Sequence, residues 1–269
     1  DKELKDNLPD SEVESKNLSI LVVDDNPDIL NFLSKVLTRD YFVISATSGE
    51  EAISILENNQ VDIIVSDVMM DEMNGFELCR LIKSNINTSH IPVILLTAKT
   101  DTASKIEGLE SGADAYMEKP FSPFHLNAQI RNLLDKREEV KRKYASNPFA
   151  EIHSTVHSKL DEEFMNKCSV IIENNISEPE FSVDILAKEL GMSRTSVFVK
   201  VKGITGMTPN DFIKLTRLKV ACKMMTETSY RITEIVLMVG FSSSSYFAKC
   251  FQKQFGMLPT EFMKDVRKN

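Results

Sequence analysis

The sequence predicts an α/β domain with a doubly wound parallel sheet, followed by an all-α domain. Two short apolar runs that end in acidic residues predict the sheet: residues 18–23 lead into Asp24 and Asp25, and residues 61–66 lead into Asp67. Continuous apolar runs of this length suit strands that are buried on both faces of a parallel sheet. A repeated pattern of short helices in the second half of the chain predicts the all-α domain.

The acidic residues lie where open α/β sheets place their binding sites, at the carboxyl ends of the strands. Three carboxylates that converge there repel one another unless a divalent cation or a proton lies between them. The alternative is that these residues cap helices, because Asp25-Asn26-Pro27 and Asp67 both precede helical patterns. Capping explains one aspartate more readily than three, so we favour a site.

Two further apolar runs end in polar residues. Thr97 closes the run of residues 92–97, and Lys119 closes the run of residues 115–119. Because the carboxyl ends of parallel strands share one edge of the sheet, a hydroxyl and an ammonium group are expected beside the carboxylates.

This set of residues resembles the signature of response-regulator receiver domains. The intervals agree with that family: 42 residues from Asp25 to Asp67, 30 more to Thr97 and 22 more to Lys119. The resemblance covers about residues 18–134 and implies a flavodoxin-like fold with a five-stranded parallel sheet. It also implies that a histidine kinase phosphorylates an aspartate of this domain in the presence of Mg²⁺.

The resemblance assigns a role to each residue. Asp67 is the phosphoacceptor, and Lys119 is the cation that pairs first with Asp67 and then with the phosphoryl group. Thr97 carries a hydroxyl that can turn towards a phosphoryl oxygen, which makes it both a catalytic and a switch residue. Tyr116 matches the aromatic switch position, although a half-buried strand tyrosine would give the same pattern. The implied Mg²⁺ site consists of oxygen ligands from Asp25 and Asp67 and from the backbone carbonyl of Met69, with Asp24 holding a metal-bound water.

A metal-dependent phosphohydrolase can also start from an aspartate at a strand end. Haloacid-dehalogenase-like phosphatases need a second acid two residues after the nucleophile, as a general acid for the leaving group. Here Asp67 is followed by Val68 and Met69. We therefore expect that the chain is not an enzyme beyond promoting its own phosphorylation.

Composition and charge agree with two packed domains. Hydrophobic residues make up 42% of the 269 residues, which is enough for packed cores. Residues 1–135 hold 11 Lys+Arg and 24 Asp+Glu, a net charge of −13, and residues 136–269 hold the other 21 and 16, a net charge of +5. A basic half beside an acidic half is a modest indication of nucleic-acid binding. Four scattered cysteines and the lack of an apolar segment of membrane-spanning length favour a cytoplasmic location.

The second half contains an internal repeat. Residues 206–214 align with residues 256–264 at an offset of 50, and Gly191 and Gly240 fall at equivalent points 49 residues apart. Each unit reads as a helix, a glycine turn and a second helix, which is the helix-turn-helix unit. We expect helices over residues 183–190 and 193–202, over 209–225 between the units, and over 232–239 and 243–255.

This double helix-turn-helix resembles the AraC-type DNA-binding domain over about residues 165–268. Gly240-Phe241-Ser242 and Phe255-Gly256 carry the resemblance most specifically. It implies binding to double-stranded DNA. The alternative, a helical bundle with fortuitous glycines, is disfavoured because the pattern occurs twice in the same order. Relatives usually carry arginine where this chain has Val199, so one DNA contact of the family is expected to be absent.

In a helix-turn-helix, the second helix is the one that enters the DNA groove, and we call it the reading helix. Each reading helix must pack one side against the core and present the other side to DNA. Val197 and Val201, and likewise Phe247 and Phe251, recur four residues apart and should face the core. The remaining polar residues are the DNA-binding candidates, with lysines and arginines mainly on phosphates and the first residues of each helix at base edges. They are Ser193, Arg194, Thr195, Ser196 and Lys200 in the first unit, and Ser243, Ser244, Ser245, Tyr246, Lys249 and Lys253 in the second.

We expect four segments: a disordered or inter-domain lead at residues 1–17, the receiver at 18–135, a charged, solvated linker at 136–159 and the AraC-type domain at 160–269. A receiver followed directly by this domain also resembles the carboxyl-terminal part of hybrid two-component proteins. The start at Asp1, without methionine, fits an excised fragment or a processed end. The parent would then be a membrane-anchored hybrid kinase, while this fragment itself has no direct membrane contact.

The expected activity is phosphorylation-controlled DNA binding in transcription. Phosphorylation would change a face formed by Thr97, Tyr116 and residues 98–134, and this face would mediate homodimerisation. RNA polymerase is a further candidate partner of a transcriptional regulator of this kind. The competing hypothesis is a receiver that is not phosphorylated and serves as a protein-interaction scaffold with constitutive DNA binding. The complete set of receiver residues argues against it.

Overall fold

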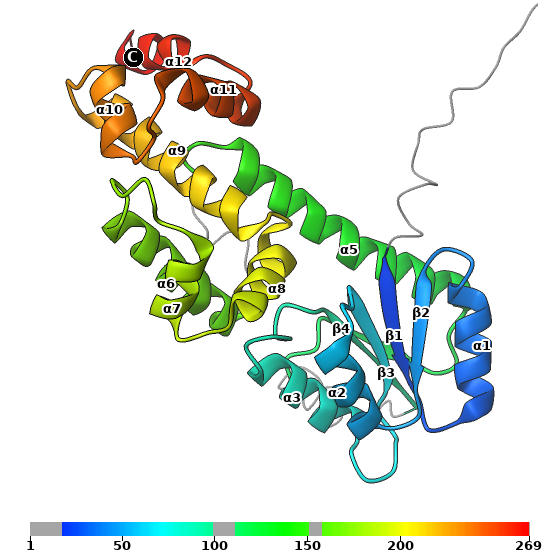
Figure 1. The fold of residues 1–269 in the computed structure, drawn as a ribbon. Coiled ribbons are helices and arrows are strands. Elements are labelled where there is room, and N and C mark those ends of the chain that lie inside the picture. The colour runs from blue at the N-terminus through cyan, green and yellow to red at the C-terminus, as the bar shows by residue number, and fades with distance from the viewer. Residues whose placement is uncertain (1–17, 99–110, 151–157, 269) are drawn as a thin grey trace, which may run out of the picture. The chain divides into compact units, whose positions relative to one another are not determined.

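The structure is a computed structural model that describes residues 18–98, 111–150 and 158–268 (Figure 1). The chain divides into two compact units, Asp1–Leu134 and Asp135–Asn269. The lead at residues 1–17, part of the expected switch face at residues 99–110 and residues 151–157 of the expected linker lie outside the described residues.

The first unit is a five-stranded, fully parallel sheet in the order β2-β1-β3-β4-β5, which confirms the predicted α/β class (Figure 1). Helices connect β1 to β2, β2 to β3 and β3 to β4, as parallel strands require. The strands are β1 (Ser19–Val23), β2 (Phe42–Ala46), β3 (Ile63–Asp67), β4 (Val93–Thr97) and β5 (Ala115–Glu118). The helices are α1 (Pro27–Leu37), α2 (Gly49–Asn58), α3 (Gly75–Ser84) and α5 (Pro123–Ser146).

Alternate residues of the central strands serve two separate cores. Ile20 and Val22 of β1 pack with α1 and the first part of α5, whereas Leu21 and Val23 pack with α2 and α3. This arrangement explains why the strands read as continuous apolar runs rather than as alternating ones. Strand β2 lies at the edge of the sheet, where Ala46 is its only fully buried residue.

The second unit is all-helical, as predicted. Its helices are α6 (Lys159–Asn174), α7 (Val183–Leu190), α8 (Arg194–Thr205), α9 (Pro209–Glu227), α10 (Ile232–Met238), α11 (Ser244–Phe255) and α12 (Pro259–Lys268). Helices α7 and α8 form the first helix-turn-helix, and α10 and α11 form the second. Val197 and Val201 lie in one core and Phe247 and Phe251 in another, all fully buried, which confirms the predicted inward faces.

Helix α9 joins the two cores. Its first half packs in the core with α6, α7 and α8, and its second half packs in the core with α10, α11 and α12. The side chain of Arg217, near the middle of α9, donates to the carbonyl of Gly240 at 3.1 Å and to the carbonyl of Glu178 at 2.5 Å. The guanidinium group of Arg217 thus binds one carbonyl in the turn of the second helix-turn-helix and another in the loop after α6.

Helix α5 continues beyond the first unit. Its residues 135–146, which we call the α5 extension, belong to the second compact unit. The many charges of this segment predicted a solvated linker over most of its length. The structure instead buries Tyr144 to 5% exposure against Phe212 of α9. The extension is therefore part of the packed second unit.

The two turn glycines have different surroundings. Gly191 and Gly240 both adopt left-handed φ values, 66° and 72°. A Cβ atom at Gly191 would have no heavy atom within 4 Å, whereas at Gly240 it would lie 2.5 Å from the carbonyl oxygen of Ile176. Left-handed backbone strains any L-residue, but only the second position adds a steric clash.

We therefore expect Gly191→Ala to lower the free energy of unfolding by about 1–2 kcal/mol through backbone strain alone. Gly240→Ala should cost at least about 1 kcal/mol more, because the backbone around Ile176 must move. Urea titration followed by circular dichroism measures both variants, with Gly191→Ala as the matched control. Equal losses would show that the contact with Ile176 does not constrain this turn.

Candidate functional site

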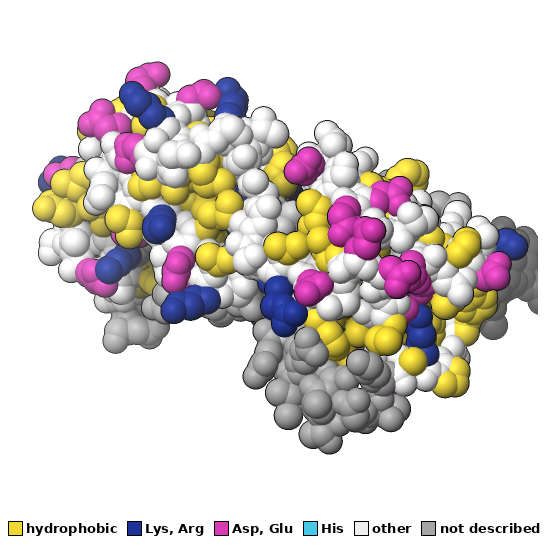
Figure 2. All heavy atoms as spheres, turned by 90° about the horizontal axis from the view of Figure 1, so that it is seen from below, with side chains coloured by type: hydrophobic (Ala, Val, Ile, Leu, Met, Phe, Trp, Pro, Cys, Tyr) yellow, Lys and Arg dark blue, Asp and Glu magenta, His cyan; other side chains and the backbone are white. Residues whose placement is uncertain are grey.

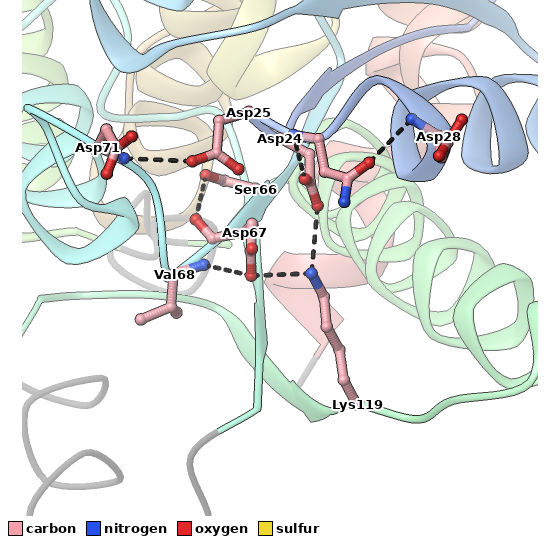
Figure 3. Close-up of polar contacts among 9 residues, drawn as sticks. Asp24, Asp25, Asp28, Ser66, Asp67, Val68, Asp71 and Lys119 are labelled. Atoms are coloured by element: carbon pink, nitrogen blue, oxygen red, sulfur yellow. Dashed lines mark hydrogen bonds and ion pairs between the residues drawn. The ribbon is translucent and has the colours of Figure 1, made fainter.

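The predicted acidic residues converge at the carboxyl edge of the sheet (Figure 3). Asp24 follows the last residue of β1, and Asp67 is the last residue of β3. Thr97 ends β4, and its backbone carbonyl accepts a hydrogen bond from the backbone N–H of Lys119 just after β5. The parallel register therefore brings four strand ends to one place, as the sequence predicted.

Carboxylate oxygens of Asp24, Asp25 and Asp67 all lie within 4.8 Å of one another. The ammonium group of Lys119 lies 3.1 Å from Asp24 Oδ2 and 3.0 Å from Asp67 Oδ1, so one cation bridges two of the acids (Figure 3). Three hard oxygen donors at this separation suit a small divalent cation. The residues present thus fit Mg²⁺.

Burial makes this cluster electrostatically costly. Asp24 is fully buried, and desolvation raises the pKa of its carboxyl group above the ordinary value. A hydrogen bond from the backbone N–H of Asn26 and the charge of Lys119 act in the opposite direction, and the neighbouring Asp67 raises the pKa further. The net upward shift of the pKa shows that the cost of burying the Asp24 charge exceeds its stabilisation by Asn26 and Lys119.

The backbone around Asp67 is tightly held. The N–H of Val68 donates to Asp67 Oδ1 at 2.8 Å, and the hydroxyl of Ser66 donates to the Asp67 carbonyl at 2.8 Å (Figure 3). A Cβ atom at Gly75 would lie 2.1 Å from the Asp67 carbonyl oxygen, so only glycine permits this approach of α3 to the strand end. Oδ1 of Asp67 thus has two partners, the N–H of Val68 and the ammonium group of Lys119.

The remaining receiver residues lie around this cluster. Thr97 is fully buried at the end of β4, and the side chain of Met69 is exposed two residues after Asp67. The ring of Tyr116 in β5 is half-buried and stacks on Phe76 of α3, with ring centroids 6.3 Å apart. The backbone N–H of Asp71 donates to Asp25 Oδ2 at 3.3 Å, which positions the most exposed of the three acids.

In the first reading helix, α8, the predicted residues have unequal positions. Ser193 caps the helix by accepting a hydrogen bond from the backbone N–H of Ser196, and Thr195 is exposed. Arg194 is exposed and donates to both carboxylate oxygens of Asp184 at 3.1–3.2 Å. An exposed ion pair of this kind is weak, so it can exchange for another anion.

The prediction that Lys200 faces DNA is wrong for this structure. Its side chain is fully buried and forms an ion pair with Asp161 of α6, which is also buried. The helical spacing alone left Lys200 on the polar side of α8. A buried carboxylate from another helix, 39 residues earlier, decides its orientation. Such a pair anchors α8 on α6 rather than meeting a ligand.

The sequence analysis missed two exposed residues on the same helix. Phe198 is 37% exposed, and the ammonium group of Lys202 lies 5.7 Å from the centre of its ring. Both lie on the helical face of Arg194, at intervals of four residues. The pattern Arg194, Phe198, Lys202 could have been found in the sequence by following this face instead of selecting polar residues.

In the second reading helix, α11, all the predicted residues lie on the surface. Ser243 caps the helix by accepting from the N–H of Tyr246. Ser244, Ser245, Tyr246, Lys249 and Lys253 are exposed. The face of the molecule in Figure 2 shows acidic side chains gathered on the first unit and mixed charges on the second. This agrees with the charge difference between the two halves of the sequence.

Comparison with known families matches both units. Residues 20–131 match the response regulator receiver domain, and residues 186–265 match a helix-turn-helix domain. Among the described residues, no helix is long and apolar enough to cross a membrane.

Three relatives illustrate the similarity. The chain is 39% identical over 258 residues to "Histidine kinase P4" of Formosa agariphila, covering 96% of this chain and 19% of that protein. It is 42% identical over 128 residues to "Transcriptional regulatory protein YvrH" of Bacillus subtilis, covering 47% and 53%. It is 33% identical over 213 residues to "Probable transcriptional regulator ycf27" of Guillardia theta, covering 75% and 79%. The chain thus spans about a fifth and about half of the first two relatives.

The acidic edge of the sheet, the two helix-turn-helix units and these matches agree with one another. The chain belongs to the response regulators of two-component systems, with a receiver domain followed by an AraC-type helix-turn-helix DNA-binding domain.

Proposed function

We propose that Asp67 accepts a phosphoryl group from a histidine kinase, and that this phosphorylation controls DNA binding by the second unit. The observation that carries the proposal is the contact of Asp67 with Lys119 beside two further carboxylates at the sheet edge. Mg²⁺ would be held by Asp24, Asp25, Asp67 and the carbonyl of Met69. Bound there, it would neutralise oxygens that otherwise repel an anionic nucleophile from phosphorus.

The chain's own residues supply the nucleophile and its orientation. A carboxylate oxygen of Asp67 attacks the phosphorus of a phosphohistidine and forms an acyl phosphate. The P–N bond breaks at the same time, and its electron pair leaves with the imidazole nitrogen, which takes a proton from water. Lys119, now paired with Asp67, can follow the charge to the phosphoryl oxygens. Thr97 and Tyr116 would transmit the change as switch residues.

Phosphorylation can be tested directly by mass. Incubation of the chain with acetyl phosphate and Mg²⁺ should add the mass of one phosphoryl group, and Asp67→Asn should abolish the gain because the amide is no nucleophile here. Asp71→Asn is the matched control, since Asp71 is an exposed acid that contacts the site through its backbone only. A wild-type chain that gains no mass would favour the unphosphorylated scaffold instead.

The buried charge of Asp24 gives a stability prediction. Its pKa in the folded chain lies above the ordinary value, so folding favours the neutral acid. This contribution is present at low pH and is lost as the pH rises through the raised pKa. At neutral pH without metal, Asp24→Asn should therefore raise the free energy of unfolding by on the order of 1 kcal/mol.

The gain from Asp24→Asn should disappear in acid, where the wild-type carboxyl group is already neutral. Added Mg²⁺ should stabilise the wild-type chain more than the variant. Asp25→Asn is the control for the metal-free titrations only, because Asp25 is exposed and is itself a proposed Mg²⁺ ligand. Urea titrations at two pH values measure all three chains. A destabilised Asp24→Asn chain at neutral pH would contradict the electrostatic account.

The output of the switch is proposed to be transcriptional control at double-stranded DNA. Phosphorylated receivers would pair as a homodimer and bring two DNA-binding domains to adjacent sites, which raises the effective concentration of the second domain. The match to "Histidine kinase P4" over 96% of this chain supports a parent protein that also contains a kinase. A cytoplasmic location and contact with RNA polymerase remain proposals that follow from this activity.

One lysine variant and one arginine variant can distinguish contacts with DNA bases from contacts with phosphates. Lys249→Ala should weaken binding to all duplexes about equally and lower the salt dependence by about one unit of log K against log salt concentration. Arg194→Ala should cost roughly 1–3 kcal/mol at one base position only. Asp184→Asn is the control: it releases the Arg194 guanidinium and should leave binding unchanged or tighter. A uniform loss for Arg194→Ala would make Arg194 a phosphate contact.

A further inference from the structure

The α5 extension contacts both reading helices of the DNA-binding unit. It bonds to the end of α8 through Arg137 and to the end of α11 through Ala145. We propose that the α5 extension fixes the position of α8 relative to α11, with Arg137 and Gln254 as positioning residues for DNA binding. This inference rests on the proposed reading of DNA by these two helices.

The contact with α8 lies at the carboxyl end of that helix. Arg137 Nη2 donates to the Gly203 carbonyl at 3.0 Å, in the last turn of α8. Carbonyls in a last helical turn lack partners within the helix, and a cation there also meets the negative end of the helix dipole. Lys141 lies one turn further along the extension. A Cβ atom at Gly206, the C-cap of α8, would lie 3.2 Å from Lys141 Cδ.

The contact with α11 is made by the other end of the extension. Gln254, in the last turn of α11, donates through Nε2 to the carbonyl of Ala145 at 3.0 Å. That carbonyl belongs to the last turn of α5, where the backbone again needs an outside partner. Each end of the extension is thus joined to a different reading helix by a hydrogen bond that satisfies an otherwise unpaired helix terminus.

Between these ends, the extension is fixed on α9. The Tyr144 ring is buried, its centroid lies 6.5 Å from the Phe212 centroid, and the Lys219 ammonium group lies 3.7 Å from its centre. Lys219 also donates to the carbonyl of Ala150 at 2.7 Å, just beyond the helix. The same side of the extension is the less exposed one, because the positions of 135–146 that are not fully exposed are 137, 140, 141, 144 and 145.

The arrangement matters because the two reading helices pack in separate cores. Val197 and Val201 of α8 lie in one cluster, and Phe247 and Phe251 of α11 lie in the other. Within the described residues, α9 is shared by both clusters, and Ile176 and Phe255 pack against both. The α5 extension adds a further connection, made by hydrogen bonds to the ends of the two helices themselves. Two reading helices on one duplex must match its helical repeat of roughly 34 Å, so a fixed interval between them raises affinity only for DNA that carries both segments.

The test uses the full chain and a duplex selected by the wild-type chain from a random DNA library. Two further duplexes carry one of the two protected segments scrambled. Arg137→Met should lose about tenfold in affinity for the intact duplex, equal to about 1.4 kcal/mol, and stay within about twofold on each scrambled duplex. Gln254→Leu should behave alike. The double variant should lose little more than either single one, because freeing one end already releases the interval.

Arg142→Met is the matched control, since the Arg142 guanidinium bonds only to the carbonyl of Glu138 in its own helix among the bonds of the described residues. It should match the wild-type chain on all three duplexes. Retained binding to the scrambled duplexes also shows that the variants are folded. Equal loss on all three duplexes, or no loss on the intact one, overturns the positioning role. A wild-type chain that selects no duplex would instead refute DNA binding itself.

Discussion

The first unit depends on the meeting of three carboxylates at one edge of a parallel sheet. Asp24 is fully buried there, and its raised pKa shows that the charge of Lys119 does not fully compensate the cost. A site with this excess of negative charge has a use for a bound cation and for a group that changes its charge. The buried strands, the glycine at position 75 and the hydrogen bond from Val68 all serve to hold that unfavourable arrangement in place.

The second unit solves a different problem, which is to carry two reading helices on one scaffold. Helix α9 runs through both cores, and Arg217 joins the turn of the second helix-turn-helix to the loop after α6. Burial lowers the pKa of Arg217, and its Nε atom is buried without a hydrogen-bond partner in the described part of the chain. The hydrogen bonds from Arg217 to the carbonyls of Gly240 and Glu178 therefore offset part of the cost of burying its charge.

Several residues at the DNA-binding surface also have a structural task. Ser193 and Ser243 each cap the reading helix that follows them, so the serines at the expected base edges fix the helix ends as well. Arg194 forms an exposed ion pair with Asp184, whereas the side chain of Lys200 is fully buried. The exposed face of α8 in the first helix-turn-helix is therefore formed by Arg194, Thr195, Phe198 and Lys202.

The sequence by itself determined the features that depend on neighbours along the chain. The apolar runs located β1, β3, β4 and β5, and the Asp24, Asp67, Thr97 and Lys119 positions followed because parallel strands end at one edge. The turn glycines and capping serines located helices α7 to α11 to within a few residues, whereas α6 and α12 were not predicted. Only the tertiary structure decided the rest. Lys200 is buried because it forms an ion pair with Asp161 of another helix. Strand β2 is half-exposed because it lies at an edge of the sheet. The charged α5 extension packs because its Tyr144 stacks on Phe212 of α9. Each of these outcomes depends on a residue or strand that is distant in the sequence. A local pattern of apolar and charged residues therefore cannot predict it.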